Sequence, residues 1–290
     1  MVMSELYCPV CNNKLSNELT DWHRLCSKCF YECSDLKPSI NTKSTHDMVH
    51  EEDRSIGLKS LRQSNFLAIL KQMESLCLAE GSSILEVGCA HGWFLELANE
   101  KYTAVGIEPD RHIFEKTLTK GLKLRNGYFP DALGDNEVFD IIIFNDVLEH
   151  IPDTHKILEA VKNHLACKGF LIVNIPDSSG VFYRLSKILQ KIKITSPFER
   201  LWQAGFPSPH LHYFNSGNLI QICEKHGFEA VAKHTLPSIH SQGLKERIGH
   251  INNQNPFVVS FMTLLLKPLL PFINLFPSDI VVIYFQQKGS

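Results

Sequence analysis

The fold is decided by Ile84-Leu85-Glu86-Val87-Gly88-Cys89-Ala90-His91-Gly92-Trp93-Phe94-Leu95. A short apolar run ends in an acid, small residues follow, and an apolar pattern with helical spacing then begins. This order predicts a strand, a tight turn and the start of a helix. Gly88 and Gly92 would let the backbone turn sharply and approach a ligand closely. The free N–H groups of the first helical turn could then bind that ligand.

A dinucleotide-binding fingerprint is the first interpretation of such a turn. It requires glycines at positions 88, 90 and 93. The chain has Ala90 and Trp93 at two of these three positions, so the sequence argues against a dinucleotide site.

Three further blocks follow the same strand-and-turn design. Residues 103–108 form a short apolar run that ends in Glu108, where a carboxylate could hold the two hydroxyls of a ribose. Residues 139–144 form an apolar run typical of a strand buried on both faces, and Asn145-Asp146-Val147-Leu148-Glu149-His150-Ile151-Pro152-Asp153 follows it. Residues 165–176 predict a helix end, a glycine turn and a strand.

The remaining periodicity predicts alternating helices and strands. We expect helices from Leu58 to Gly81, over 110–120, over 154–166, over 181–194 and from a Ser216 cap to Gly227. We expect further strands over 122–125, 170–175, 228–235 and 279–285. Such alternation predicts an α/β fold with a doubly wound, mostly parallel sheet, whose ligands bind at the carboxyl ends of the strands.

Together these blocks resemble the class I S-adenosylmethionine (SAM) methyltransferases that act on small molecules. Glu86, Gly88 and Gly92 match the E/D-x-G-x-G-x-G loop of that family, and Ala90 replaces its middle glycine. The segment Asn145–Asp153 is especially typical of that family, and the resemblance covers about residues 60–235. It implies a Rossmann-like sheet of seven strands, with residues 279–285 as the antiparallel member.

The resemblance also implies which residues contact SAM. Glu108 would hold the ribose, and Asn145 and Asp146 would flank the methionine part. Tyr128 stands where the family often has an acid, so adenine would be held by stacking, with Asp131 as a shifted substitute. The full set expected at the cofactor is Glu86, Gly88, Cys89, Ala90, Gly92, Glu108, Pro109, Tyr128, Phe129, Asn145 and Asp146.

His150 is the leading candidate for a catalytic base. It follows the fourth strand at the carboxyl edge of the sheet, and imidazole suits proton transfer near neutral pH. His210 and His212 are alternatives, because they lie in an aromatic-rich segment that covers the substrate pocket in this family. Asp146, Glu149 and His150 also resemble the Mg²⁺ site of ubiquinone-pathway O-methyltransferases. Many relatives with the same phrase hold no metal, so the metal-free form is favoured.

Four cysteines near the N-terminus have the spacing of a zinc ribbon. Cys8 and Cys11 form one C-x-x-C pair, Cys26 and Cys29 form a second, and 14 residues separate the pairs. Such pairs match a tetrahedral zinc site, which would supply the folding free energy that so small a segment lacks. Cys33 and His23 are alternative ligands, and a redox C-x-x-C pair is the alternative function. Residues 15–25 would hold the strands of the ribbon.

We therefore expect three regions. Residues 1–36 form the zinc ribbon, 37–57 a linker or a lid over the cofactor, and 58–290 the SAM-binding domain. Within it, residues 240–277 form an apolar insertion on the substrate side. The part over 256–276 is too interrupted to span a bilayer, so it either packs over the pocket or touches a membrane peripherally. The basic stretch 184–193 is compatible with such contact and also with a solvated helix face.

Composition and charge favour a soluble enzyme. The chain has 290 residues, and 44% are hydrophobic and 21% charged. A net charge of −2 gives no sign of a nucleic-acid surface. The N-terminus lacks a basic head followed by an apolar run, so we expect a cytoplasmic protein, with peripheral membrane contact as an option.

The sequence thus predicts SAM-dependent methyl transfer to an oxygen, or a carbon, of a sugar, glycan precursor or natural product, with no nucleic-acid partner. Zinc-ribbon relatives of this type include sugar methyltransferases. Two alternatives stay open: a catalytically silent SAM-fold protein whose ribbon recruits a partner, and a metal-assisted phenol methyltransferase. A methyltransferase of RNA or protein is disfavoured, because the chain lacks an N/D-P-P-Y-type motif.

Overall fold

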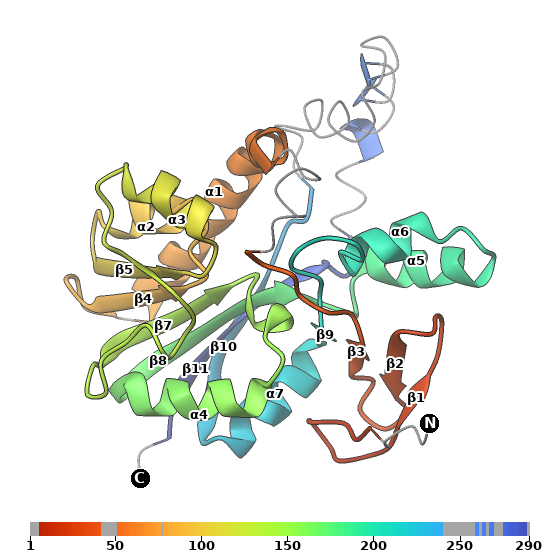
Figure 1. Ribbon diagram of the computed structural model, residues 1–290, viewed down its shortest axis with the longest axis horizontal. Helices are drawn as coiled ribbons and strands as arrows, with labels where there is room; N and C mark the ends of the chain where they lie inside the picture. Colours follow the sequence, from red (N-terminus) through yellow and green to blue (C-terminus); the bar gives the residue numbers. More distant parts are fainter. Residues whose placement is uncertain are drawn as a thin grey trace.

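The computed structural model describes residues 6–41, 51–76, 78–239, 259–260, 263–264, 267–269 and 275–288 (Figure 1). A central sheet of seven strands runs through it in the order β10-β11-β8-β7-β4-β5-β6. The strands are β4 (Ser83–Val87), β5 (Thr103–Glu108), β6 (Leu124–Asn126), β7 (Phe139–Asn145), β8 (Leu165–Pro176), β10 (Phe228–Leu236) and β11 (Ile280–Gln287). Neighbouring strands from β8 to β6 are parallel, and β11 is antiparallel to both β8 and β10. The predicted doubly wound sheet and its antiparallel last strand are confirmed.

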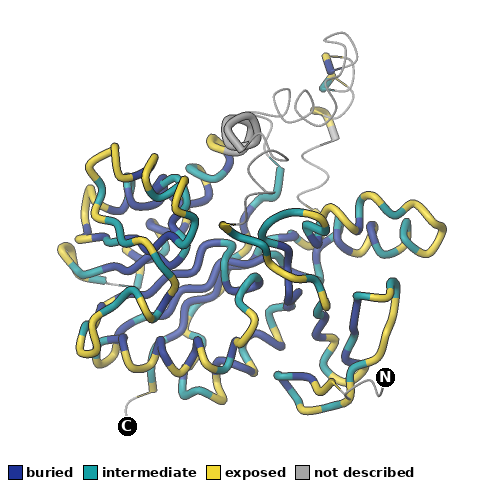
Figure 2. The backbone as a smooth tube through the Cα atoms, viewed as in Figure 1, coloured by how far each residue is buried: buried dark blue, intermediate teal, exposed yellow. Residues whose placement is uncertain are grey.

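The helices are α1 (Glu51–Ser75), α2 (Trp93–Ala98), α3 (Arg111–Leu118), α4 (Thr154–His164), α5 (Val181–Lys191), α6 (Ser196–Leu201) and α7 (Ser216–Lys225). Helices α1 and α2 pack on one face of the sheet and α4 and α7 on the other, whereas α5 and α6 lie beside the N-terminal segment (Figure 1). Successive residues of β7 point to opposite faces, as a strand requires. Ile141 and Ile143 pack in the apolar cluster that includes α1 and α2, whereas Ile142 and Phe144 pack in the cluster that includes α4 and α7. The strands form the buried centre of Figure 2.

Some predicted boundaries are wrong. Helix α1 begins at Glu51, inside the linker expected over 37–57, and residues 42–50 of that linker lie outside the described part. Strand β8 begins at Leu165, where the preceding helix was expected to continue. Asn215, not Ser216, caps α7, because its side chain accepts from the backbone of Asn218 and Asn218 bonds back to it. Most of the insertion predicted over 240–277 lies outside the described residues.

A second, small sheet contains the N-terminal segment. Strands β1 (Leu15–Asn17), β2 (His23–Cys26) and β3 (Glu32–Ser34) are antiparallel, so the segment has a third strand beyond the predicted residues 15–25. The fourth strand, β9 (His212–Tyr213), comes from the larger domain and pairs with β3. The ribbon and the larger domain therefore share one sheet.

A third apolar cluster fastens the ribbon to α5 and α6. Tyr183, Phe198, Trp202 and Tyr213 form its buried centre, and Trp22 of the ribbon packs against them. The rings of Trp22 and Phe198 are stacked with centroids 5.7 Å apart. Aromatic pairs of this kind contribute about 0.5–1.5 kcal/mol beyond the area that they bury. The ribbon is thus an integral part of the structure that carries the loop 202–214.

Candidate functional site

A cavity of about 570 Å³ opens at the carboxyl edge of the central sheet. Ligand pockets in proteins have volumes of about 300–1,000 Å³, so this cavity could hold a small molecule. Its walls come from the ends of β4, β5 and β7, from the loop after β6, from residues 38 and 40, and from residues 203–208. Pro38 and Ile40, in the segment 37–57 predicted as a linker or a lid, line the cavity, and Asn41 bonds to Pro109 and Arg111.

The loop after β4 turns through three left-handed residues. Gly88 and Gly92 have φ of +69°, and Ala90 has φ of +43°. A Cβ atom at Gly88 would lie 2.7 Å from Val147 Cγ2, and one at Gly92 would lie 2.5 Å from Leu122 Cδ1. Ala90 adopts a backbone conformation that costs an L-residue about 1–2 kcal/mol, so the turn keeps its shape although the middle glycine is missing.

Glu108 lines the cavity at the end of β5 and is 6% exposed. Its Oε2 accepts from the backbone N–H of Ala90, and its Oε1 accepts from that of Asp110, both at 2.8 Å. Two fixed donors orient the carboxylate, and each of its oxygens can accept a further hydrogen bond. Glu108 could therefore bind a pair of hydroxyls, as predicted for a ribose.

Glu86 and Asn145 lie behind the wall of the cavity instead of lining it. Asn145 Nδ2 donates to Glu86 Oε1 at 2.8 Å. Glu86 Oε2 and Asn145 Oδ1 are buried and lack hydrogen-bond partners among the described residues. Burial raises the pKa of Glu86 from 4.5 to about 8, with the nearby Glu108 charge acting in the same direction. Two unsatisfied acceptors beside the turn would suit a cationic group such as the amino group of a methionine moiety.

The raised pKa of Glu86 predicts a stability that falls as the pH rises. The folded state keeps a proton that the unfolded state releases above pH 4.5, so the carboxyl destabilises the fold increasingly up to about pH 8. We expect Glu86→Gln to raise the free energy of unfolding of the ligand-free protein by about 4 kcal/mol at pH 8.5 and by under about 1 kcal/mol at pH 5. Urea unfolding at both pH values measures this, and an equal effect at the two would contradict it.

Cys89 and Gly92, both predicted at the cofactor, contribute to packing. The Cys89 side chain is buried in the core that includes α1 and α2, and its N–H donates to the carbonyl of Ile107 at 3.0 Å. Gly92 allows the start of α2 to approach Leu122 and Thr117. Neither lines the cavity, and their predicted contact with the cofactor stays a prediction.

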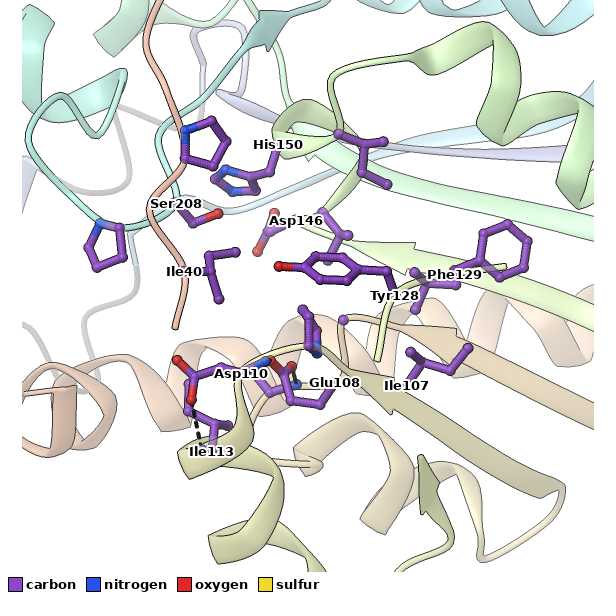
Figure 3. A pocket seen from close by; sticks show the side chains of 18 of the residues that line it. Ile40, Ile107, Glu108, Asp110, Ile113, Tyr128, Phe129, Asp146, His150 and Ser208 are labelled. Carbon is purple, nitrogen blue, oxygen red and sulfur yellow. Dashed lines mark hydrogen bonds between the residues drawn. The ribbon is translucent and has the colours of Figure 1, made fainter. Parts of the chain in front are cut away.

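Tyr128 and Phe129 follow β6 and line the cavity. Tyr128 is 55% exposed, and its ring projects into the cavity between the Asp146 and Glu108 sides (Figure 3). Phe129 is buried beneath it. Asp131 is exposed and does not line the cavity, so the structure supports stacking on Tyr128 and not the shifted acid.

His150 lines the opposite side, in the single turn η1 (Leu148–His150) (Figure 3). Its Nδ1 lies 2.9 Å from the carbonyl oxygen of Pro209. A carbonyl only accepts, so Nδ1 carries the proton and Nε2 is the basic nitrogen of the neutral ring. The geometry fixes the tautomer that a base would need.

The two alternative histidines are buried and do not line the cavity. His212 Nε2 donates to the carbonyl of Ile151 at 2.8 Å, and its Nδ1 accepts from the hydroxyl of Tyr31. Burial lowers the pKa of His212 to about 4, so the ring is neutral and structural. The ring of His210 lies 4.7 Å from that of His150 and bonds to Gln203. The predicted catalytic roles of His210 and His212 do not fit these positions.

A cluster of side chains that could bind a metal ion adjoins the cavity. Glu149, His150 and His210 place ligand atoms within 4.8 Å of one another. Asp146, expected in this group, lies instead with its carboxylate 3.7 Å from the guanidinium of Arg62. Burial raises the pKa of Glu149 well above its usual range, with the Asp146 charge adding to the effect, and neither carboxyl oxygen has a hydrogen-bond partner among the described residues. Burial therefore favours the neutral form of the Glu149 carboxyl.

The four predicted cysteines come together in the ribbon. Their sulfur atoms lie within 4.8 Å of one another, with Cys8 and Cys29 3.5 Å apart and Cys11 and Cys26 3.4 Å apart. Tetrahedral zinc with Zn–S bonds of 2.3 Å places the sulfurs about 3.8 Å apart, so a zinc ion fits with small adjustments. The alternative ligands lie elsewhere, since His23 bonds to Glu32 and Cys33 is not in the cluster.

Sequence reasoning missed several residues of the cavity wall. Trp93, Ile113 and Phe206 line it, and so does Arg62. Trp93 and Phe206 belong to segments that the sequence analysis already singled out, whereas Arg62 reaches the cavity only through the packing of α1.

Comparison with known proteins agrees with this geometry. A family model described as a methyltransferase domain matches residues 59–233. The C-methyltransferase NovU of Streptomyces niveus is 25% identical over 169 residues, which cover 56% of this chain and 36% of the relative.

Two solved structures share the fold. A SAM-dependent methyltransferase of Thermotoga maritima, described as a possible histamine N-methyltransferase, has a TM-score of 0.53 at 18% identity, over 83% of this chain and 97% of that one. The complex between the Haloferax volcanii Trm112 methyltransferase activator and a methyltransferase gives a TM-score of 0.55 at 11% identity, over 82% and 94%.

Proposed function

The chain belongs to the methyltransferase domain family, and we propose that it is a SAM-dependent enzyme that methylates a carbon or oxygen of a small molecule with His150 as the base. The acceptor would be a sugar, a glycan precursor or a natural product. One observation carries the proposal: Glu108 and His150 face the same cavity from opposite sides (Figure 3). Glu108 could hold the cofactor, and His150 could take a proton from the acceptor.

The residues of the cavity fit SAM. Glu108 would hold the ribose hydroxyls, and Tyr128 would stack on adenine. The N–H-rich turn at Gly88 would face the methionine part, with the buried oxygens of Glu86 and Asn145 behind it. When bound, SAM supplies a methyl group that is already activated as a sulfonium, so the protein contributes mainly positioning.

The remaining step assigned to the protein is removal of a proton. His150 Nε2 would accept the proton of an acceptor hydroxyl, or of a carbon beside a carbonyl, as the new bond to the methyl carbon forms. The carbonyl of Pro209 would stabilise the resulting imidazolium through Nδ1–H. Residues 203–208 and Ile40 close the cavity beside His150, and would keep water from the acceptor.

The likeness to the C-methyltransferase NovU favours carbon as the acceptor atom. The matched region spans only 36% of that relative, so the proposal extends to the type of bond and not to a particular substrate. Assays with ketone-bearing and hydroxyl-bearing sugar nucleotides separate the two cases, because only carbon methylation consumes an acidic C–H.

Replacing Glu108 with alanine tests the cofactor site. The variant loses two charge-assisted hydrogen bonds to the ribose and also the anchors of Ala90 and Asp110, so we expect affinity for SAM to fall about 100-fold or more. Calorimetric titration with SAM and S-adenosylhomocysteine measures the change. Glu115→Ala removes an exposed glutamate of α3 and should bind normally. Unchanged affinity in a folded Glu108→Ala protein would place the cofactor elsewhere.

A metal-assisted reaction is the second candidate, and the group Glu149, His150 and His210 favours it. Mg²⁺ or a similar ion held there would orient a phenolate, and activity would then require added metal. If added metal does not change the rate of methyl transfer, the metal-assisted reaction is contradicted and His150 remains the proposed base. If the protein binds SAM but methylates nothing across a broad screen, the silent-scaffold alternative gains support.

We also propose that Cys8, Cys11, Cys26 and Cys29 hold a structural zinc ion. Four thiolates without an open position are typical of structural zinc and leave no place for substrate. The support is the separation of the sulfurs and the small size of the ribbon, whose strands have only three or four residues each.

A further inference from the structure

Helix α5 presents its apolar side chains outward. Leu185, Ile188 and Ile192 recur at the three- to four-residue spacing of one helical face and are 48%, 60% and 62% exposed. The face turned toward the protein carries Tyr183 and Ser186, both buried. A helix that only closed the core would have the reverse pattern. Among the described residues, nothing covers the outward face, which we call the α5 ridge.

Positive charge borders this ridge. Arg184, Lys191 and Lys193 are exposed beside it, and no acidic residue occurs between positions 181 and 198. The whole chain has a net charge of −2, so basic residues are concentrated here against the overall balance. Lys187 does not contribute a free positive charge to this border, because its ammonium pairs with Glu32 of the ribbon at 2.8 Å.

The ridge continues beyond α5. Ile194 is 49% exposed just after the helix. Leu275 and Phe276 are 80% and 56% exposed, and Phe276 and Val181, the first residue of α5, line one small cavity. Exposed apolar side chains from two distant parts of the sequence therefore border the same arm, which extends from the body of the molecule (Figures 1 and 2).

We propose that the α5 ridge docks onto the surface of a bilayer that contains anionic lipids. Apolar side chains flanked by lysine and arginine are the pattern of helices that lie in the membrane interface. Each exposed basic side chain adds attraction to anionic headgroups. A second copy of the chain fits less well, since a twofold axis on the ridge would place these cations against one another. No helix among the described residues has the length and apolar content to cross a bilayer, so the contact is peripheral.

Docking would also orient the active site. Helix α5 leads through α6 into residues 203–208, which line the cavity beside His150. The docking proposal itself does not depend on methyl transfer.

Vesicle co-sedimentation of the full, zinc-replete protein tests the proposal. The probes are vesicles of phosphatidylcholine alone and of equimolar phosphatidylcholine and phosphatidylglycerol. We expect binding to the anionic vesicles only, weakened by salt. Leu185→Ser/Ile188→Ser/Ile192→Ser should reduce it about tenfold or more, and Lys191→Gln/Lys193→Gln several-fold. The matched control is Leu118→Ser/Val138→Ser, which removes exposed apolar side chains of other elements and should bind like the wild type.

Thermal unfolding and SAM titration establish that each variant is folded. The proposal is overturned if the wild type ignores both kinds of vesicle, or if the ridge and control variants bind alike. It is also overturned if light scattering shows a dimer that the ridge substitutions convert to a monomer, because a second copy then covers the face.

Discussion

Replacing His150 with alanine lowers the rate constant of methyl transfer by about two to four orders of magnitude, the contribution typical of a positioned base. The ring lines the cavity, and the Pro209 carbonyl fixes its proton on Nδ1, so alanine removes the nitrogen that would receive the acceptor proton. SAM affinity should change little, since Glu108 lies on the other side of the cavity (Figure 3). Single-turnover assays with labelled SAM separate the chemical step from binding.

His112→Ala provides the control for this experiment. His112 is an exposed histidine of α3 that does not line the cavity, and its loss should leave the rate constant unchanged. His150→Gln keeps a polar side chain of similar reach but cannot take up a proton at neutral pH, so it should be as slow as alanine. A rate within about threefold of the wild type in both His150 variants would assign proton removal to another group.

The second large effect follows zinc removal. Structural zinc sites contribute about 10 kcal/mol to the folding of small domains, so Cys26→Ser or a strong chelator should unfold the ribbon. Methyl transfer should then fail as well. Strand β3 pairs with β9, and Ser34 donates two hydrogen bonds to the segment that precedes β9. Its N–H donates to the carbonyl of Leu211, and its hydroxyl donates to the carbonyl of His210. That segment includes Pro209, the partner of His150.

Three measurements check this prediction. Elemental analysis should give one zinc per chain in the wild type and none in Cys26→Ser. Thermal unfolding should shift downward, and amide exchange should rise over 209–214 as well as in the ribbon. Cys33→Ser, a substitution outside the sulfur cluster, should keep its zinc. Full activity in a zinc-free, folded protein would show that the ribbon does not position the site.

The central sheet could be predicted from the sequence, because its signals are local. The apolar run over 139–144 and the glycines at 88 and 92 determine a strand and a turn without reference to distant residues. Glu108 and His150 were found for the same reason, since each follows a strand end at the edge where ligands bind.

The environment of each residue was harder to predict. Glu86 and Asn145 belong to the same motifs, but their side chains bond to each other behind the cavity wall. His210 and His212 share one segment, and only tertiary packing decides that His212 bonds to Tyr31 while His210 approaches Glu149. No sequence pattern predicted β9 either, because a strand of two residues is too short to show a periodic pattern.

The pairing of β3 with β9 also determines when the small sheet can form during synthesis of the chain. Tyr31 and His212 are 181 positions apart in the sequence, so a ribosome releases the ribbon long before its fourth strand exists. Contacts between such distant positions form slowly, and domains usually fold as they emerge. The ribbon is therefore synthesised before the central sheet, but its own sheet is completed only after β9 has emerged. A truncated protein that begins at α1 would leave β9 as an unpaired edge with exposed aromatic neighbours, a surface that favours aggregation.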